Sequence, residues 1–148
     1  MLARGLMAEG HAARGTSRDP ARRAALAAEG GEPVEGDPDR IGTLIAALAQ
    51  VGIVYLLLGS ATGEPDAIAA LHGERLSMLL EKLIDTTVRG VVYEAAGTVD
   101  EGVLRGGAQL VRAVCQRSRI PYALLETDPA ERELWLSEAL GAGAKLAG

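Results

Sequence analysis

Short apolar runs and helix starts alternate along this chain. Three Asp-Pro pairs each follow a short extended or apolar segment and precede a helix-compatible one: Asp19-Pro20, Asp37-Pro38 and Asp128-Pro129. Aspartate can accept the free N–H groups of a first helical turn, and proline fits the first helical position because it has no N–H to leave unpaired there. Residues 62–66 form a related start with carboxylates in the first turn, where the helix dipole favours negative charge. The pattern predicts four helices, each beginning soon after a strand.

The periodicity of the apolar residues predicts the layers of the fold. Apolar residues recur at helical spacing in three segments: 41–48, 68–83 and 103–114. The predicted strands are 51–58, 91–95 and 121–125, with weaker candidates at 12–16 and 33–35. Continuous apolar runs are typical of parallel strands that helices cover on both faces. We therefore predict a single α/β domain over residues 1–148, a three-layer, Rossmann-like parallel sheet with helices on both faces.

The N-terminal segment predicts that the sheet lacks its first strand. Residues 1–9 are expected to form a helix that Gly10 closes, with Leu2 and Leu6 on one face. In a parallel α/β domain a strand should feed such a helix. The expected explanation is a truncated sequence, either a late start or a fragment of a longer coding sequence. The alternative is a genuine short protein in which another strand or a partner fills the gap.

Charge and composition narrow the classes of partner. The net charge of -5, with scattered arginines, argues against binding to nucleic acid or to anionic membrane surfaces. No Phe, one Trp and three Tyr leave few aromatic platforms on which bases could stack. The first ten residues hold no apolar run long enough for a signal peptide or a membrane span, and a single cysteine cannot form an internal disulfide. We therefore expect a cytoplasmic protein.

The N-terminal fifth of the chain resembles a known superfamily. The order Leu-Ala-Arg-Gly-Leu-Met-Ala-Glu-Gly-His, followed by Ala-Ala-Arg-Gly-Thr-Ser-Arg-Asp-Pro, resembles the first helix and second strand of NAD(P)-binding short-chain dehydrogenase/reductase proteins. It is most similar to the extended and atypical members related to NAD-dependent epimerase/dehydratases, and in element order the resemblance covers nearly the whole chain. In that family a Gly-x-x-Gly-x-x-Gly loop follows the first strand. No such pattern occurs in this sequence, and its place would be before Met1.

The resemblance implies that the ends of the second and third strands bind the adenosine part of the cofactor. Thr16, Ser17 and Arg18 stand where such proteins recognise the adenosine ribose. A hydroxyl followed by arginine suits the 2′-phosphate of NADP better than NAD, because the guanidinium offers a planar fork to phosphate. The alternative is that Arg18 merely precedes a helix in solvent. Asp37 occupies a position whose relatives contact adenine, and a helix N-cap explains it equally well.

Small residues after the later strands complete the implied cofactor edge. They are Gly59, Ser60, Ala61, Thr62, Ala95 and Ala96. A glycine there lets a ribose or pyrophosphate lie close to the chain because it has no side chain, although a plain strand-to-helix turn explains 59–63 as well. Gly97, Glu126 and Thr127 lie at the same carboxyl edge, where ligands of open α/β sheets bind. The expected cofactor is NADP or NAD, with NADP favoured by Arg18, and no metal site is expected.

The family's proton-transfer pair is absent from the sequence. Its reductases and epimerases use Tyr-x-x-x-Lys, in which the lysine lowers the pKa of the tyrosine. The only lysines here are Lys82 and Lys145, and Met78 and Gly141 stand four residues before them. Catalytic residues are therefore unknown.

Three other candidate groups have ordinary explanations. Glu94 and Glu126 would act as acid and base if they faced one pocket, although a polar residue at a strand end is the commoner interpretation of Glu94. His72 and Glu74 lie two apart in a helical segment, which favours an exposed helix surface over a metal pair. Cys115 falls on an apolar helix face and is predicted to be a buried packing thiol.

Two function hypotheses remain open. One is an atypical short-chain dehydrogenase/reductase that binds NAD(P)(H) and, in full-length form, acts as an oxidoreductase or epimerase-like enzyme. The other is a non-catalytic dinucleotide-binding sensor or interaction module, or an inactive fragment. The expected partners are a dinucleotide and a small-molecule substrate that the sequence does not identify. Trp135 is expected to anchor the last helix on the sheet, in the core, and the alternative that it lies at a dimer face leaves a homodimer open.

Overall fold

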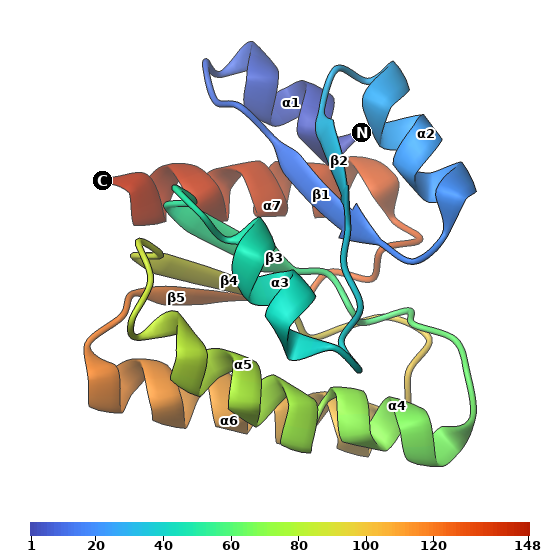
Figure 1. Ribbon diagram of the computed structural model, residues 1–148, viewed down its shortest axis with the longest axis vertical. Helices are drawn as coiled ribbons and strands as arrows, with labels where there is room; N and C mark the ends of the chain where they lie inside the picture. Colours follow the sequence, from blue (N-terminus) through green and yellow to red (C-terminus); the bar gives the residue numbers. More distant parts are fainter. The chain divides into compact units, whose positions relative to one another are not determined.

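The computed structural model describes residues 1–148, which divide into two compact units, 1–49 and 50–148. The elements of the first unit are α1 (Leu2–Ala8), β1 (Arg14–Ser17), α2 (Pro20–Ala28), β2 (Glu32–Glu35) and α3 (Ile41–Ala47). Strands β1 and β2 pair in parallel, with Thr16 opposite Val34, and α2 packs against both strands (Figure 1). Leu26 of α2 lies over Gly15 and Gly31, so close that a Cβ on either glycine would meet its side chain. The two weaker strand predictions are thus confirmed.

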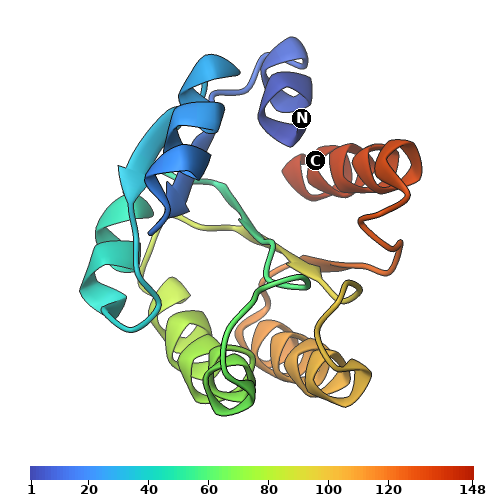
Figure 2. The same cartoon turned by 90° about the vertical axis from the view of Figure 1, so that its right-hand side faces the viewer.

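The second unit contains a three-stranded parallel sheet in the order β3-β4-β5. Its elements are β3 (Ile53–Leu56), α4 (Pro65–Leu71), α5 (Glu74–Leu83), β4 (Gly90–Glu94), α6 (Glu101–Ser118), β5 (Tyr122–Leu125) and α7 (Arg132–Ala147). Helices α5 and α6 lie together on one face of the sheet and α7 covers the other (Figure 2). Both crossovers fall on one face because consecutive parallel strands are joined with one handedness. The predicted α/β class, with parallel strands between helices, is confirmed.

The three Asp-Pro pairs form the same local hydrogen bond but start helices differently. In each, the aspartate Oδ1 accepts the N–H two residues on, at 2.9 Å, from Ala21, Asp39 and Ala130. Only Asp19 is a helix N-cap, with Pro20 at the first position. The helix starts predicted at Asp37 and Asp128 lie before the observed ones, because a turn comes first and α3 begins at Ile41 and α7 at Arg132.

The predicted helix over 68–83 is two helices in the structure. Helix α4 ends at Leu71 and α5 begins at Glu74, because Gly73 adopts φ −116° and ψ −102°, outside the helical region. The predicted start at 62–66 is confirmed, with Pro65 in the first turn of α4. The N-terminal helix is also confirmed, and Gly10 follows it with φ +91°. None of the helices combines the length and the apolar character that a membrane span needs.

The hydrophobic core is centred on β4. All five residues of this strand are buried, and the side chains of Val91, Val92 and Tyr93 have no exposed surface. Leucines of α5 and apolar residues of α6 cover one face. Trp135 of α7 is 7% exposed, so the expectation that it packs in the core is confirmed. Burial of this apolar surface is the main force that holds the second unit together.

Two tyrosines of the sheet fit against glycines of the covering helices. A Cβ placed on Gly107 of α6 would lie 2.0 Å from the Tyr93 hydroxyl, and one on Gly143 of α7 would lie 2.1 Å from the Tyr55 hydroxyl. Glycine inside a helix costs about 1 kcal/mol relative to alanine. The lost helix propensity at these two positions is therefore the cost of admitting a tyrosine hydroxyl to the helix surface.

Neighbouring glycines of α6 provide a test of this fit. Nothing lies within 4 Å of a Cβ on Gly106, so Gly106→Ala should raise the free energy of unfolding by up to about 1 kcal/mol through helix propensity. Gly107→Ala should lower it by about 1–3 kcal/mol, because the new methyl group displaces the Tyr93 hydroxyl. Chemical denaturation followed by circular dichroism measures both. Equal stabilisation by the two substitutions would contradict the packing described here.

Candidate functional site

The carboxyl ends of β1 and β2 carry the polar residues expected to meet an adenosine ribose. Ser17 lies opposite Glu35 in the sheet register, so the residues after both strands emerge at one end. The Ser17 hydroxyl accepts the N–H of Asp19 at 3.0 Å, and Arg23 donates to the Ser17 carbonyl at 2.7 Å. Thr16 is exposed and Ser17 half-buried. The backbone after β1 is thus fixed by side-chain bonds just where Arg18 leaves the strand.

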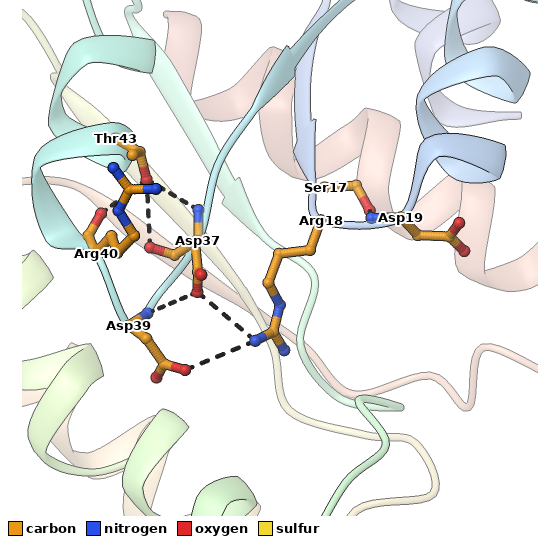
Figure 3. Close-up of polar contacts among 7 residues, drawn as sticks. All are labelled: Ser17, Arg18, Asp19, Asp37, Asp39, Arg40 and Thr43. Atoms are coloured by element: carbon orange, nitrogen blue, oxygen red, sulfur yellow. Dashed lines mark hydrogen bonds and ion pairs between the residues drawn. The ribbon is translucent and has the colours of Figure 1, made fainter.

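Arg18 is held between two carboxylates (Figure 3). Its Nη1 lies 3.6 Å from Asp37 Oδ1 and 3.6 Å from Asp39 Oδ2, while the arginine side chain remains 63% exposed. The structure therefore brings together Arg18 and Asp37, which the sequence analysis placed in one site. Asp39 was missed, although the Asp37-Pro38-Asp39 sequence indicates a turn that gathers two carboxylates.

Asp37 belongs to this turn and is not a helix N-cap. Its N–H donates to Thr43 Oγ1 at 2.9 Å, and the Thr43 hydroxyl donates in turn to the Arg40 carbonyl at 2.7 Å. The residue before α3 is Arg40, which has no capping side-chain bond. The N-cap alternative for Asp37 is therefore wrong, and its carboxylate is left to accept the Asp39 N–H and to face Arg18.

In the second unit, the loops after β3 and β4 pack directly on each other. A Cβ on Gly59 would lie 2.1 Å from the Ala96 carbonyl oxygen, and one on Gly97 would lie 2.1 Å from the Gly59 carbonyl oxygen. The Gly59 carbonyl accepts the Val99 N–H at 3.0 Å, and Ser60 Oγ accepts the Thr98 N–H at 3.4 Å. The close approach that requires glycine at position 59 is therefore made by the neighbouring loop of the protein.

These contacts unite the small residues expected at the carboxyl edge of β3 and β4. Gly59 is buried, Ala61, Ala95 and Ala96 are half-buried, and Ser60 and Thr62 are exposed. The Ala95 N–H continues the ladder to the Leu125 carbonyl of β5 at 2.8 Å. The exposed hydroxyls are thus carried on a loop whose own backbone is tied to the sheet.

A single peptide group of this loop is bonded on both of its sides. The Leu58 carbonyl accepts a hydrogen bond from His72 Nε2 at 2.9 Å and another from the Ala61 N–H at 3.2 Å. The N–H of the same peptide, on Gly59, donates to Glu94 Oε1 at 2.8 Å. Because the carbonyl and N–H of a trans peptide point in opposite directions, His72 and Glu94 hold it from opposite ends.

His72 is buried, which corrects the expectation that it lies on an exposed helix surface. It is 2% exposed, and its Nδ1 lies 2.6 Å from the Tyr93 hydroxyl. Nε2 must donate to the Leu58 carbonyl, because a carbonyl oxygen only accepts. In the neutral imidazole, which burial favours, Nδ1 carries no proton and accepts from the tyrosine. Burial lowers the pKa of His72, and the bond to Leu58 opposes this in part. Burial also raises the pKa of Tyr93 well above its usual range, with the nearby Glu94 charge acting in the same direction.

The position of His72 could have been found in the sequence. His72 lies four residues after Ile68 and four before Leu76, which places it on the apolar face of the helical pattern. A histidine on such a face must find partners for both ring nitrogens.

Glu94 is a buried carboxyl at the end of the central strand. It is 5% exposed, and burial raises its pKa, while the hydrogen bond from the Gly59 N–H and the nearby indole N–H of Trp135 act to lower it. Trp135 Nε1 has no partner of normal hydrogen-bond geometry, and the carboxyl of Glu94 is the acceptor that it faces. A carboxyl at the end of an apolar strand, as in Val91–Glu94, was the available sequence signal.

The remaining candidates do not form a second site. Glu126 is exposed, and its backbone N–H donates to Glu138 Oε2 at 3.4 Å. The carboxyl of Glu94 is buried, so the two glutamates lie in different environments. Cys115 is buried, and burial raises the pKa of its thiol to about 11, which confirms a packing role. No group of three or more histidine, cysteine or acidic side chains is placed to hold a metal ion.

Comparisons with known proteins support the fold alone. No family model matches this sequence, and neither does any curated protein sequence. Two crystal structures of the triphenylmethane reductase of Citrobacter sp. match 84% of this chain with a TM-score of 0.60, at 19% and 18% identity. The matched part is 43% and 44% of those chains, and one of the two is a complex with NADP(H).

The crystal structure of gox2253 is also similar, with a TM-score of 0.68 and 20% identity over 83% of this chain and 46% of that one. This chain thus spans less than half the length of the structures it matches. It shares with them a Rossmann-like α/β fold.

Proposed function

We propose that this chain binds a nicotinamide adenine dinucleotide, with NADP(H) preferred. The observation that carries the proposal is the exposed guanidinium of Arg18 at the carboxyl end of β1, the end of a parallel sheet at which nucleotides bind. One protein of similar fold was crystallised with NADP(H). The loop of residues 59–62 in the second unit presents two exposed hydroxyls at the same kind of strand end.

The carboxylates around Arg18 compete with a 2′-phosphate for the guanidinium. Asp37 and Asp39 hold the guanidinium at 3.6 Å each, a loose contact in an exposed position. Such exposed pairs are worth about 0.2–1 kcal/mol each, whereas a charge-assisted bond to phosphate is worth about 1.5–3 kcal/mol. A phosphate can therefore displace the carboxylates from Arg18, although their negative charge still opposes it.

Turnover by the usual acid of this fold is disfavoured, which makes a binding module without catalysis the second candidate. The hydroxyl of Tyr93 is buried against His72, and Tyr55 donates to the Ala139 carbonyl at 2.9 Å. The Tyr122 hydroxyl accepts from Gln116 at 3.1 Å. None of the three has a lysine four residues later.

Titration of the 148-residue chain with NADPH, followed by isothermal calorimetry and nucleotide fluorescence, tests binding. Oxidation of NADPH in the presence of a carbonyl compound, and separately of a triphenylmethane dye, tests turnover. The dye is a useful second acceptor because its cation takes up a hydride without a proton. Binding without NADPH oxidation would favour the binding module, and no binding of NADPH or NADH would refute the proposal.

Arg18→Ala should weaken NADP⁺ binding about tenfold or more and leave NAD⁺ binding nearly unchanged, because only NADP⁺ carries the 2′-phosphate. Calorimetric titration with the two oxidised nucleotides measures the ratio of their Kd values. Arg22→Ala is the matched control, since Arg22 is 78% exposed on α2 and its nearest carboxylate is that of Asp19. An equal loss of affinity for NADP⁺ and NAD⁺ would show that Arg18 does not recognise the 2′-phosphate.

Asp39→Asn should strengthen NADP⁺ binding by about two- to fivefold at low ionic strength, because one carboxylate that competes for Arg18 becomes neutral. The gain should shrink as salt is added, since the site is exposed and its charges are screened. NAD⁺ affinity serves as the internal reference. Unchanged NADP⁺ affinity at every salt concentration would show that Asp39 does not act on the ligand through Arg18.

A further inference from the structure

The Leu58–Gly59 peptide makes three hydrogen bonds at the carboxyl edge of the second unit. His72 and the Ala61 N–H bond its carbonyl, and Glu94 bonds its N–H. Both side chains that hold it are almost completely buried, at 2% and 5% exposure. A buried peptide group needs partners, but a single backbone partner for each end would satisfy it. The bonds from two ionisable side chains therefore exceed what burial of this peptide requires.

Consecutive residues of β4 act on the peptide, Glu94 directly and Tyr93 through His72. Tyr93 and Glu94 point to opposite faces of the sheet because neighbouring strand residues alternate. Tyr93 donates to His72, which donates to the Leu58 carbonyl, while Glu94 accepts directly from Gly59. The peptide is thereby aligned with β4 from both faces of the sheet. We refer to Tyr93, His72 and Glu94 as the peptide clamp.

The peptide clamp also sets the position of the neighbouring loop. Through the Gly59 carbonyl and Ser60 Oγ, the held segment accepts the N–H groups of Val99 and Thr98. The exposed hydroxyls of Ser60 and Thr62 follow within three residues of the clamped peptide. A displacement of this peptide would move both loops at the edge.

We propose that Glu94 and the Tyr93–His72 pair are positioning residues, which fix the Leu58–Gly59 peptide so that the loop over 59–62 is preformed for the dinucleotide. This inference rests on the proposed function. A loop that is already ordered loses less conformational entropy when a ligand binds, so preforming it strengthens binding. The positioning residues themselves touch no ligand in this proposal, because their side chains are buried and fully engaged with the protein.

Substitutions at Glu94 test one end of the clamp. Glu94→Gln keeps an oxygen that can accept the Gly59 N–H, whereas Glu94→Ala removes the acceptor. We expect Glu94→Ala to weaken NADP⁺ binding about tenfold, and Glu94→Gln to restore most of the loss. Glu101→Ala is a control, because Glu101 is a carboxylate on α6 with an 88% exposed side chain.

Substitutions at His72 test the other end independently. In glutamine the amide nitrogen reaches the position of imidazole Nε2, and in asparagine the amide reaches only that of Nδ1. His72→Gln should therefore keep the bond to the Leu58 carbonyl and retain NADP⁺ binding, while His72→Asn should keep only the contact with Tyr93 and lose about tenfold. Circular dichroism and thermal melting establish which variants remain folded, and the folded ones decide the comparison.

The Gly59 amide provides a readout that requires no nucleotide. Two-dimensional NMR of the 148-residue chain should show this proton shifted downfield and protected from exchange, because it donates to a carboxyl group. Both properties should be lost in Glu94→Ala and largely kept in Glu94→Gln. If the wild-type amide exchanges freely, the clamp does not exist.

The combination of NMR and calorimetry separates the possible failures. Loss of the Gly59 signal with unchanged NADP⁺ affinity in Glu94→Ala would overturn the positioning role, while the proposed function would stand. A wild-type chain that binds neither NADP⁺ nor NAD⁺ would overturn the proposed function and the positioning role that rests on it, even with a protected Gly59 amide. We expect Glu94→Ala to lose both the shifted, protected Gly59 amide and NADP⁺ affinity, His72→Asn to lose NADP⁺ affinity, and the two glutamine variants to recover most of each loss.

Discussion

The complete burial of β4 determines how polar groups are arranged in the second unit. A central parallel strand covered on both faces has no access to water, so Tyr93 and Glu94 must find partners inside the protein. Tyr93 finds the imidazole of His72, and Glu94 finds the Gly59 N–H. These partners come from the segments that flank β3 and α4, so satisfying the strand also fixes the connection between them. The same hydrogen bonds therefore satisfy the buried polar groups of β4 and order the loop at the carboxyl edge of the sheet.

The two sets of candidate site residues differ in how much free energy their contacts contribute. Around Arg18 the side chains are exposed and 3.6 Å apart, so solvent and salt screen them and a ligand can rearrange them at little cost. Around Gly59 the partners are buried, and removing one would leave a desolvated polar group without a bond, at about 1–3 kcal/mol. The first set is suited to selecting among ligands, and the second to holding a fixed shape.

Local sequence patterns predicted the local structure of this chain and did not predict its long-range partners. The Ala21 N–H donates to Asp19 and the Asp39 N–H donates to Asp37, each across two residues. The Asp-Pro pattern therefore predicts this local bond. Whether a helix follows at once depends on the chain beyond the turn, and Asp37 continues instead into a short bridge with Arg40. The three strands of the second unit were predicted because parallel strands between helices form continuous apolar runs.

The candidate site was predictable only as a set of positions along strand ends. The family resemblance placed Arg18 and Asp37 at the ends of the second and third strands, and the structure pairs them. The bond between Gly59 and Glu94 joins residues 35 apart in sequence, and no local pattern specifies such a partner. For the same reason Gly59 was interpreted through a ligand or a plain strand-to-helix turn, whereas its missing side chain accommodates the Ala96 carbonyl.

The structural use of the tyrosines limits the chemistry that this chain can perform. Tyr93 donates its only hydroxyl proton to a buried neutral histidine, and burial raises its pKa, so releasing that proton would leave an anion in the core. A carbonyl reduction requires both a hydride and a proton, and the second would have to come from water or from another group at the edge. Tyr93 therefore cannot supply that proton without a change in the core.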